Sequence, residues 1–322
     1  MKISVAMCTY NGARYIKDQL QSIARQTRLP DELVISDDAS MDGTEHILDE
    51  FSKTARFPVR LSVNRKNQGV IRNFEQAICL CDGDVIALSD CDDVWETRKL
   101  ELLERSLLQN PEVGLIFTDA EIVDASSKPI NLRLSQSVGL DRQKQRKIRS
   151  GRALDVLLAR TVVTGATMAF RSEFRDIILP LPAGGPFYHD GWIALVMAPV
   201  SAFLFIEEST IKYRAHSGQC VGIEQVPKLQ SVMRTRKTSK SFYFAQAEQF
   251  QEAYERLKAT RRTFTDQSAL LKLQDKISHL QARATMPERR LSRVRAIGKE
   301  LVNLHYHRFS RGWFSAAKDL LA

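Results

Sequence analysis

The stretch Val85-Ile86-Ala87-Leu88-Ser89-Asp90-Cys91-Asp92-Asp93 places three carboxylates directly behind an apolar run. Like charges that crowd at the end of a buried strand cost free energy unless a positive group offsets them. A divalent cation holding a nucleotide diphosphate is one such group, because Mg²⁺ binds one or two carboxylates together with phosphate oxygens. The alternative is that the aspartates cap a helix beginning near Trp95, although one cap accounts for one Asp and not for three.

Around this stretch, short β-branched runs alternate with helical patterns, which predicts βαβ units and an α/β fold with a mostly parallel sheet flanked by helices. The strands are expected at Ile3–Cys8, Leu33–Ser36, Val59–Val63, Val85–Leu88, Leu115–Thr118, Ala166–Phe170 and Ala202–Ile206. The helices are expected at Ala13–Arg25, Thr44–Thr54, Val70–Leu80, Trp95–Leu108, Ala153–Ala159 and Ile193–Ala198. Residues 126–150 are polar and strongly basic without an apolar period, which indicates a mobile loop or a surface excursion.

Positive charge gathers in the last hundred residues of the 322-residue chain. Residues 1–222 carry 27 Lys and Arg against 29 Asp and Glu, whereas residues 223–322 carry 20 against 9. This asymmetry predicts an α/β domain over 1–222 and a basic, mainly helical region over 223–322. Apolar residues of the basic region recur at near-helical spacing, so its helices either attach to an anionic membrane or pack on the first domain.

Cysteine usage and hydropathy bear on the compartment. The five cysteines are odd in number and lack zinc-type spacing, which predicts free thiols in a reducing compartment. No run approaches the ~18 apolar residues of a membrane span. The cytoplasm is therefore the expected location. The basic region offers the alternative of a peripheral position on the inner face of the cytoplasmic membrane.

Polar residues follow each of the first four expected strands: Thr9-Tyr10-Asn11-Gly12, Asp37-Asp38-Ala39-Ser40, the segment 64–69, and the acidic cluster Asp90–Asp93. Ligands of open α/β sheets bind at the carboxyl ends of the strands, so these groups are expected to converge on one site. Neither G-x-G-x-x-G nor G-x-x-x-x-G-K-[ST] is present, which disfavours hydride-transfer and P-loop enzymes.

Several motifs in one order resemble family 2 glycosyltransferases with a GT-A fold, over about residues 1–222. They are Ser4–Gly12, Asp37–Ser40 with Asp42-Gly43-Thr44, Asn67–Val70 with Asn73-Phe74, and Leu88–Trp95 with Lys99-Leu100. The later motifs His189-Asp190-Gly191-Trp192 and Tyr213–Gly218 are similar to the rhamnosyltransferase-like branch that builds bacterial surface polysaccharides. Two departures from that branch are Cys91, where Gln is common, and a tryptophan pair reduced to Gly191-Trp192.

The resemblance implies a nucleotide-sugar donor and a Mg²⁺ or Mn²⁺ ion. Asp92 would be the direct metal ligand, Asp90 would lie nearer the ribose or sugar, and His216 would bind the metal or a phosphate. The residues implied for the donor site are Thr9, Tyr10, Asn11, Asp37, Asp38, Asn67, Gly69, Arg72, Asp90, Cys91 and Arg214. Those implied for the acceptor, a saccharide or lipid-linked saccharide, are Thr164, Gly165 and Trp192.

Inverting transfer also needs a base for the acceptor hydroxyl. The resemblance places a catalytic carboxylate at Asp190, and His189 is the second candidate, since His is the usual base near neutral pH. Each has an ordinary structural explanation: Asp190 caps the helix Ile193–Ala198, and His189 orients its neighbour.

The sequence leaves two possible donors and offers two alternative functions. The branch favours dTDP-L-rhamnose, with a UDP-sugar as the alternative. A nucleotidyltransferase is disfavoured because the segment Thr9–Ala13 offers no Gly-rich signature loop. A nucleic-acid-binding protein acting through the basic region is the non-enzyme alternative, since positive patches attract phosphate backbones.

Overall fold

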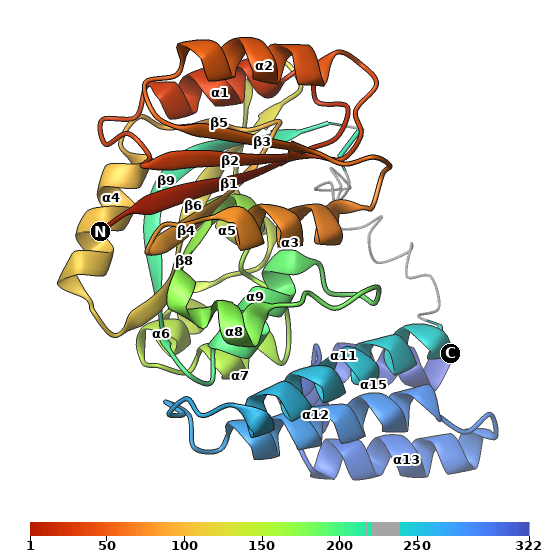
Figure 1. The fold of residues 1–322 in the computed structure, drawn as a ribbon. Coiled ribbons are helices and arrows are strands. Elements are labelled where there is room, and N and C mark those ends of the chain that lie inside the picture. Colours follow the sequence, from red (N-terminus) through yellow and green to blue (C-terminus); the bar gives the residue numbers. More distant parts are fainter. Residues whose placement is uncertain (217, 220–238, 322) are drawn as a thin grey trace.

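The computed structural model describes residues 1–216, 218–219 and 239–321. Its centre is a sheet in the order β3-β2-β1-β4-β8-β6-β9-β5, with β7 paired to β6 (Figure 1). The strands are β1 (Ile3–Thr9), β2 (Glu32–Asp37), β3 (Val59–Val63), β4 (Val85–Asp90), β5 (Val94–Trp95), β6 (Val113–Asp124), β7 (Pro129–Arg133), β8 (Met168–Arg171) and β9 (Ala202–Ala215). From β3 to β4 all neighbours are parallel, and β8 then pairs antiparallel with both β4 and β6.

Helices cover both faces of this sheet (Figure 1). They are α1 (Ile16–Ala24), α2 (Thr44–Thr54), α3 (Val70–Leu80), α4 (Lys99–Gln109), α5 (Leu134–Ser137), α6 (Arg142–Arg149), α7 (Ala153–Leu157), the 3₁₀ turn η1 (Gly165–Thr167), α8 (Arg175–Ile178) and α9 (His189–Met197). Side chains alternate along a strand, so Val5 and Met7 of β1 pack in one core with α1, α2 and α4, while Ala6 packs in the other core with α3 and α9. The continuous apolar run of each central strand follows from this two-sided burial.

The α/β architecture and the expected strands and helices of the first ninety residues are confirmed. The bounds of α2, α3 and β3 are those expected, and β1, β2 and β4 extend by one or two residues. Because β1, β2 and β4 are parallel, their carboxyl ends lie at one edge of the sheet, together with the polar residues that follow them.

Beyond β4, one expectation was wrong and two open alternatives are decided. The fourth helix begins at Lys99 and not at Trp95, because Val94 and Trp95 pair with β9 as the short strand β5. The N-cap position of α4 is Arg98, so the aspartates do not cap this helix. Residues 126–150 are an ordered excursion containing β7, α5 and α6.

The remaining differences are at β9 and α9. The strand β9 continues to Ala215, well beyond the expected end at Ile206, because it pairs in parallel along most of the length of β6. The helix α9 begins at His189 with Tyr188 as its N-cap, so Asp190 lies in its first turn. The expected cap role of Asp190 is therefore wrong in detail, although its carboxylate does lie at the amino end of the helix.

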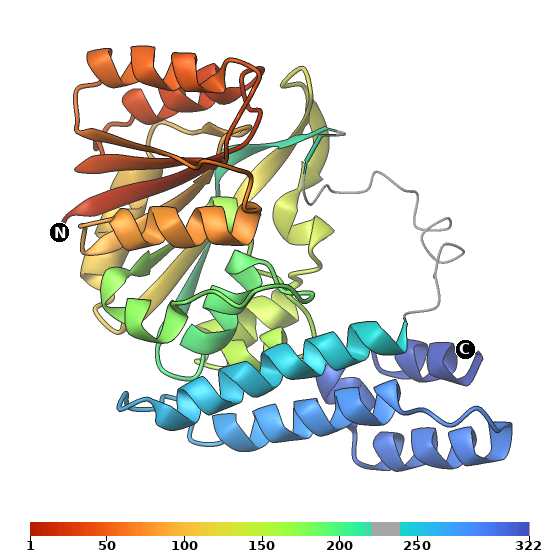
Figure 2. The same ribbon diagram turned by 45° about the vertical axis from the view of Figure 1, so that its right-hand side comes forward.

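The last described part of the chain is helical and lies along the lower side of the α/β layers (Figure 2). Its helices are α11 (Lys240–Ala259), α12 (Ala269–Ala284), α13 (Arg290–Val302), α14 (His305–Phe309) and α15 (Trp313–Leu321). Phe250 and Leu257 of α11 and Leu273 of α12 belong to the same core as α9, so this pair of helices packs on the α/β part. The predicted boundary at 222/223 lies outside the described residues.

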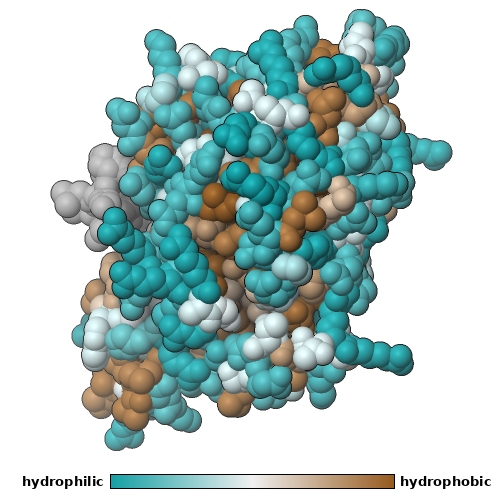
Figure 3. All heavy atoms as spheres, turned by 90° about the vertical axis from the view of Figure 1, so that its left-hand side faces the viewer, coloured by the Kyte–Doolittle hydropathy of each residue, from teal (hydrophilic) through white to brown (hydrophobic). Residues whose placement is uncertain are grey.

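Apolar residues of α13 and α15 behave differently from those of α11. Leu291, Val302 and Trp313 are 83%, 83% and 67% exposed, whereas Phe250 is 1% exposed. Apolar side chains reach the surface over this lower end of the molecule (Figure 3). The packing interpretation thus holds for α11, and the exposed residues of α13 and α15 remain available to a partner. None of the helices in the described ranges is both long and apolar enough to cross a bilayer.

A buried ionic network connects these helices to one another. Arg283 of α12 donates to both carboxylate oxygens of Asp319 in α15, at 2.6 and 2.9 Å, and to the hydroxyl of Tyr243 in α11 at 2.6 Å. The hydroxyl of Tyr306 donates to Asp319 at 2.8 Å. One carboxylate therefore connects three helices to α15.

Replacing Asp319 with Ala is expected to lower the free energy of unfolding by about 3 kcal/mol, because it leaves the Arg283 guanidinium buried without its counter-ion. The matched control is Asp275→Ala, which removes a partly exposed carboxylate 3.5 Å from Arg308 and should cost less than about 1 kcal/mol. Urea unfolding of both variants measures the difference. Equal losses would contradict the special cost assigned to the buried pair.

Candidate functional site

The ends of β1 and β2 are held together by a buried polar network. Asn73 of α3 donates to the carbonyl oxygens of Thr9 and Ser36, at 3.3 and 2.9 Å. Asp38 accepts from the backbone N–H groups of Gln68 and Gly69, both at 2.8 Å. Asp38, only 2% exposed, therefore fixes the loop that follows β3. Gly69, at φ +87°, lies in a backbone conformation that favours glycine.

Asp37, the neighbouring candidate, builds the turn after β2. Its two oxygens accept from the backbone N–H and the hydroxyl of Ser40, and its side chain is buried. Asn11, after β1, accepts from Met41 N–H at 2.9 Å and joins the same turn. Beside it Tyr10 is 52% exposed and offers an aromatic ring at the strand edge.

The loop after β1 also touches the acidic stretch. A Cβ on Gly12 would lie 2.7 Å from Thr9 Oγ1 and 3.0 Å from Cys91 Sγ, so only glycine allows this close approach. Burial raises the pKa of the Cys91 thiol to about 12, which keeps the thiol neutral. Cys91 and Thr9 thus lie on either side of Gly12, close to one another.

The three carboxylates at the end of β4 and just after it have different surroundings. Burial, followed by the charges of Asp92 and Asp190, raises the pKa of Asp90 to about 8. Burial also raises the pKa of Asp93 well above its usual value, and Asp93 accepts from Arg214 N–H at 3.1 Å. Asp92 is partly exposed and lies 2.9 Å from His216 Nε2 through its Oδ2. A positive charge beside these groups would favour their ionised forms.

A buried lysine belongs to the same cluster. Lys99 is wholly buried, donates to the carbonyl oxygen of Ala166 at 2.8 Å and lies 4.0 Å from the centre of the Trp95 ring. Burial lowers the pKa of Lys99 to about 7, against the opposing charges of Asp93 and Asp90. Sequence reasoning gave Lys99 no role beyond the resemblance, because a lysine in a first helical turn usually faces water.

The end of β9 meets the acidic stretch from the other side. Arg214 is 2% exposed, and its guanidinium donates to Asp92 O at 2.7 Å, Ser127 Oγ at 2.6 Å and Asp18 Oδ2 at 3.1 Å. It also lies 4.7 Å from the centre of the Tyr15 ring. Four of the five guanidinium N–H groups of Arg214 thus bond to the chain itself, and one of these bonds holds the carbonyl oxygen of Asp92. Neither Tyr15 nor Asp18 carried a sequence signal for this role.

Asp92 and His216 form the pair best suited to a metal ion. Their facing atoms are Oδ2 and Nε2, and the His216 ring is steadied by Tyr15, with ring centres 4.7 Å apart. Among the residues that the structure describes, no third carboxylate, imidazole or thiolate, Asp90 included, completes a compact ligand group with this pair. Two protein ligands suit Mg²⁺ or Mn²⁺, whose other positions are filled by phosphate oxygens and water.

Asp190 projects from the first turn of α9. Its Oδ2 accepts from Gly165 N–H at 3.0 Å, and its Oδ1 accepts from Gly191 N–H at 2.7 Å. Its charge acts on Asp90, so the two carboxylates lie in one electrostatic environment. The structure therefore brings Asp190 and Gly165 together beside the acidic cluster. Thr164 shapes the same turn, since its carbonyl oxygen accepts from Thr167.

The other two candidates on α9 are placed in the core. The His189 ring stacks on Phe74 with ring centres 3.8 Å apart, and both of its nitrogens are enclosed without a hydrogen-bond partner in the described part of the chain. Trp192 is fully buried and donates to the carbonyl oxygen of Ile178 at 2.9 Å. Both side chains are therefore enclosed in the core.

Arg72 and Asn67 lie on the outer side of the donor region. Arg72 of α3 pairs with Glu75 at 2.8 Å, and Glu75 in turn accepts from Leu181 N–H. Asn67 is exposed in the loop held by Asp38. A cavity of about 490 Å³ is lined by Glu96, Arg133 and neighbouring residues.

Replacing Gly165 with Ala is expected to lower the free energy of unfolding by about 1 to 3 kcal/mol, because the new Cβ would lie 2.5 Å from Nε2 of the enclosed His189 ring. Gly298→Ala in α13 is the matched control: no described atom lies within 4 Å of its Cβ position, and Ala favours a helix by up to about 1 kcal/mol. Thermal unfolding compares the two. A neutral Gly165→Ala would contradict the close contact.

The comparisons with known proteins agree with this geometry. Residues 4–175 match the family model "Glycosyl transferase family 2". An uncharacterized glycosyltransferase of Nostoc sp. is 27% identical over 217 residues, covering 67% of this chain and 65% of that protein. The abequosyltransferase RfbV of Salmonella typhimurium is 34% identical over 117 residues, covering 36% of this chain and 35% of that protein. The matches to the first curated relatives span 59% to 65% of the relatives' lengths.

A solved structure shares the fold over nearly the whole chain. The crystal structure of S. aureus TarS residues 1–349 in complex with UDP-GlcNAc has a TM-score of 0.58 and 17% sequence identity, covering 99% of this chain and 88% of that one. The expected GT-A architecture with a helical extension is confirmed by this likeness. The family model covers more than half of the 322 residues, and the chain therefore belongs to glycosyl transferase family 2.

Proposed function

We propose that the protein is an inverting, metal-dependent glycosyltransferase that moves a sugar from a nucleotide-sugar donor to a saccharide or lipid-linked saccharide in bacterial surface polysaccharide biosynthesis. The observation that carries this proposal is the pairing of Asp92 with His216 at 2.9 Å, in an acidic cluster where the charges of both Asp92 and Asp190 act on Asp90. These residues come from three distant parts of the sequence. Their convergence at the carboxyl edge of the parallel strands supports a diphosphate site there.

The donor would bind across the ends of β1, β2 and β4. The ring of Tyr10 is exposed for stacking on a nucleobase, and the Asp38 network holds the loop that borders the base. Asp92 and His216 would hold Mg²⁺ or Mn²⁺, which stabilises negative charge on the leaving diphosphate. Arg214 keeps Asp92 in place through its bond to the Asp92 carbonyl oxygen.

Asp190 would take the proton of the acceptor hydroxyl. The two backbone N–H groups that donate to its oxygens fix the orientation of the carboxylate, and a positioned carboxylate is one of the groups that act as a general base. As the proton moves to Asp190, the acceptor oxygen bonds to the anomeric carbon and the bond to the diphosphate oxygen breaks. Configuration inverts because attack and departure occur on opposite faces in one displacement.

The donor is proposed to be dTDP-L-rhamnose, with a UDP-sugar of the same family chemistry as the alternative. Support comes from the rhamnosyltransferase-like motifs His189–Trp192 and Tyr213–Gly218. The names of relatives point to several donors: one is an abequosyltransferase, and a glucosyltransferase of Escherichia coli uses UDP-Glc. A direct assay must therefore decide the sugar.

The experiment is a panel of dTDP-rhamnose, UDP-, GDP- and CDP-sugars incubated with the purified protein and Mg²⁺ or Mn²⁺. Thermal shift reports donor binding, and released nucleoside diphosphate reports hydrolysis or transfer. A metal-dependent response to one donor supports the proposal, and that donor identifies the sugar. No response to any nucleotide sugar, together with salt-sensitive binding of DNA or RNA, would favour the nucleic-acid-binding alternative.

The basic helical region is proposed to rest on the anionic inner face of the cytoplasmic membrane, where lipid-linked acceptors lie. Trp313 and Phe314 are exposed on α15, and Arg289, Arg290 and Arg295 are exposed at the start of α13 and along it, the helix that packs against α15. Apolar side chains beside basic ones suit an anionic bilayer surface.

Replacing Trp313 and Phe314 with Ser is expected to weaken binding to phosphatidylglycerol vesicles about 10-fold or more, since each ring loses its insertion free energy. Leu271→Ser is the matched control, because Leu271 is 62% exposed on α12 and lies outside the exposed set of α13 and α15. Co-sedimentation with vesicles measures both. Equal binding by the double variant and the parent would remove the membrane from this proposal.

A further inference from the structure

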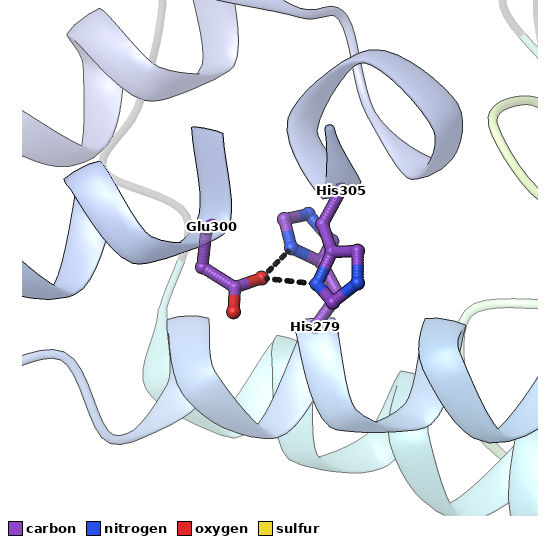
Figure 4. A group of neighbouring side chains, drawn as sticks. All are labelled: His279, Glu300 and His305. Carbon is purple, nitrogen blue, oxygen red and sulfur yellow. Dashed lines mark hydrogen bonds and ion pairs between the residues drawn. The ribbon is translucent and has the colours of Figure 1, made fainter. Parts of the chain in front are cut away.

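Two histidines and one glutamate converge in the C-terminal helical region, far from the donor site. His279 comes from α12, Glu300 from α13 and His305 from the start of α14. Their nearest ligand atoms, each histidine Nδ1 and a Glu300 oxygen, all lie within 4.8 Å of one another. Figure 4 shows both imidazoles directed at the same carboxylate oxygen, at 2.6 Å for His279 and 3.0 Å for His305.

The chain presents these side chains through an unusual turn. α13 ends at Val302, and Leu304 then takes φ +58°, a left-handed conformation that is rare for a leucine. The turn reverses the chain so that Glu300 and His305 face the same point. His279 is held opposite them by edge contact with the Tyr306 ring, whose centre lies 5.0 Å away.

An outer contact suits metal ligation. His279 Nε2 lies 3.0 Å from Ser310 Oγ. Such a contact to the second ring nitrogen is the usual support of a metal-bound histidine.

We propose that His279, Glu300 and His305 bind a transition-metal dication, with Zn²⁺ as the foremost candidate. Imidazole nitrogens with one carboxylate suit Zn²⁺, Co²⁺ or Ni²⁺, whereas Mg²⁺ prefers oxygen ligands. Tetrahedral Zn²⁺ separates its ligand atoms by about 3.3 Å, so the distances from Glu300 to His279 and His305, now 2.6 and 3.0 Å, would have to lengthen by less than about 1 Å each. Water fills the fourth position on the side of His305, whose side chain is 15% exposed.

The metal would join α12, α13 and α14. α13 and α14 otherwise belong mainly to a small core of their own around Ile297 and Tyr306, in addition to the Arg283 network. A metal bound to the folded state alone would stabilise this region by mass action. This site does not depend on the proposed transfer reaction.

The test uses untagged full-length protein carrying Asp92→Ala, which removes the other proposed metal site. Co²⁺ titration is followed by visible absorption, and Zn²⁺ competes for the same site. One equivalent of Co²⁺ with a tetrahedral spectrum is expected. His305→Ala should weaken Co²⁺ binding by at least about 100-fold, and Ser310→Ala by about 10-fold, as is usual for an outer contact. The matched control His307→Ala removes an exposed histidine of the same helix and should leave affinity unchanged.

Equal Co²⁺ affinity in His305→Ala and the parent would overturn the proposal, as would absence of stoichiometric binding. A thiolate charge-transfer band would also overturn it, because it would place the ion on cysteine. If His305→Ala alters the fold, Glu300→Gln provides the second variant. It keeps the size of the side chain, so it should lower the affinity for Co²⁺ while the metal-free protein keeps its helix content. Failure of these tests leaves donor binding at Asp92 and His216 untouched, since that site is measured separately with Asp92 intact.

Discussion

Replacing Asp190 with Asn is expected to lower the rate of sugar transfer about 10³-fold while donor binding persists. A positioned general base contributes about 10² to 10⁴ in rate, and the amide of Asn cannot take the acceptor proton at neutral pH. The donor is held by other residues, at the ends of β1, β2 and β4, so its affinity should stay within a factor of a few. Initial rates with saturating acceptor and donor titrations by calorimetry measure the two quantities.

The substitution is nearly isosteric, which limits structural side effects. Asp190 accepts from Gly165 and Gly191 through separate oxygens, and Asn can keep one of these bonds. The lost bond should cost about 1 kcal/mol of stability, visible as a small shift in unfolding temperature. Asp176→Asn is the matched control: it removes an exposed carboxylate of α8 that pairs with Arg262 and should leave transfer unchanged.

Two results would count against Asp190 as the base. Transfer by Asp190→Asn at the parent rate would exclude a proton-accepting role. Loss of donor binding together with transfer would instead place Asp190 in the donor site. The buried His189 would then need to be reconsidered, although its enclosed ring offers no route to the acceptor without movement of α9.

The sequence predicted the parallel half of the sheet well because each strand there is buried on both faces. The runs Ile3–Cys8 and Val85–Leu88 are apolar throughout, and periodicity alone locates them. By contrast, Glu207 and Glu208 interrupt the apolar pattern of β9, so its continuation to Arg214 depends on pairing with β6, which no local pattern encodes. Trp95 was assigned to a helix for the same reason: its strand exists only through Ile211.

In the candidate site too, local motifs located some residues, and features that depend on packing were missed. Motif resemblance located Asp92, Asp190 and His216, and the structure gives each an arrangement consistent with the proposed chemistry. It did not reveal that the side chains of Arg214 and Trp192 are buried, because burial depends on packing between distant elements. Tyr15 contacts His216 across two hundred residues of sequence, which no spacing rule could predict.

Replacing Asp92 with Ala is expected to lower kcat/KM about 10³-fold and to abolish the stimulation by Mn²⁺. The loss corresponds to about 4 kcal/mol, the scale of charge stabilisation that a bound metal gives to a leaving diphosphate. His216→Ala should have a loss of similar size if His216 is the second protein ligand. Mn²⁺ binding measured by electron paramagnetic resonance, with and without nucleotide, checks the direct cause.

The double variant decides whether Asp92 and His216 act on one ion. Their facing atoms are 2.9 Å apart, and residues that hold a single ligand lose their contribution once either is removed. The double variant should therefore be no more than a few-fold worse than either single variant, whereas independent roles would multiply to about 10⁶-fold.

Asp18→Asn supplies the control, because Asp18 touches the Arg214 guanidinium at the edge of the same network but has no place in the metal pair. It should lower kcat/KM by less than about 10-fold and leave Mn²⁺ affinity unchanged, since the Asp18 side chain is 57% exposed and the Arg214 guanidinium keeps its bonds to Asp92 and Ser127. Two results would show that Asp92 and His216 do not bind the same ion. They are losses of kcat/KM that multiply in the double variant, and an affinity for Mn²⁺ that does not depend on Asp92.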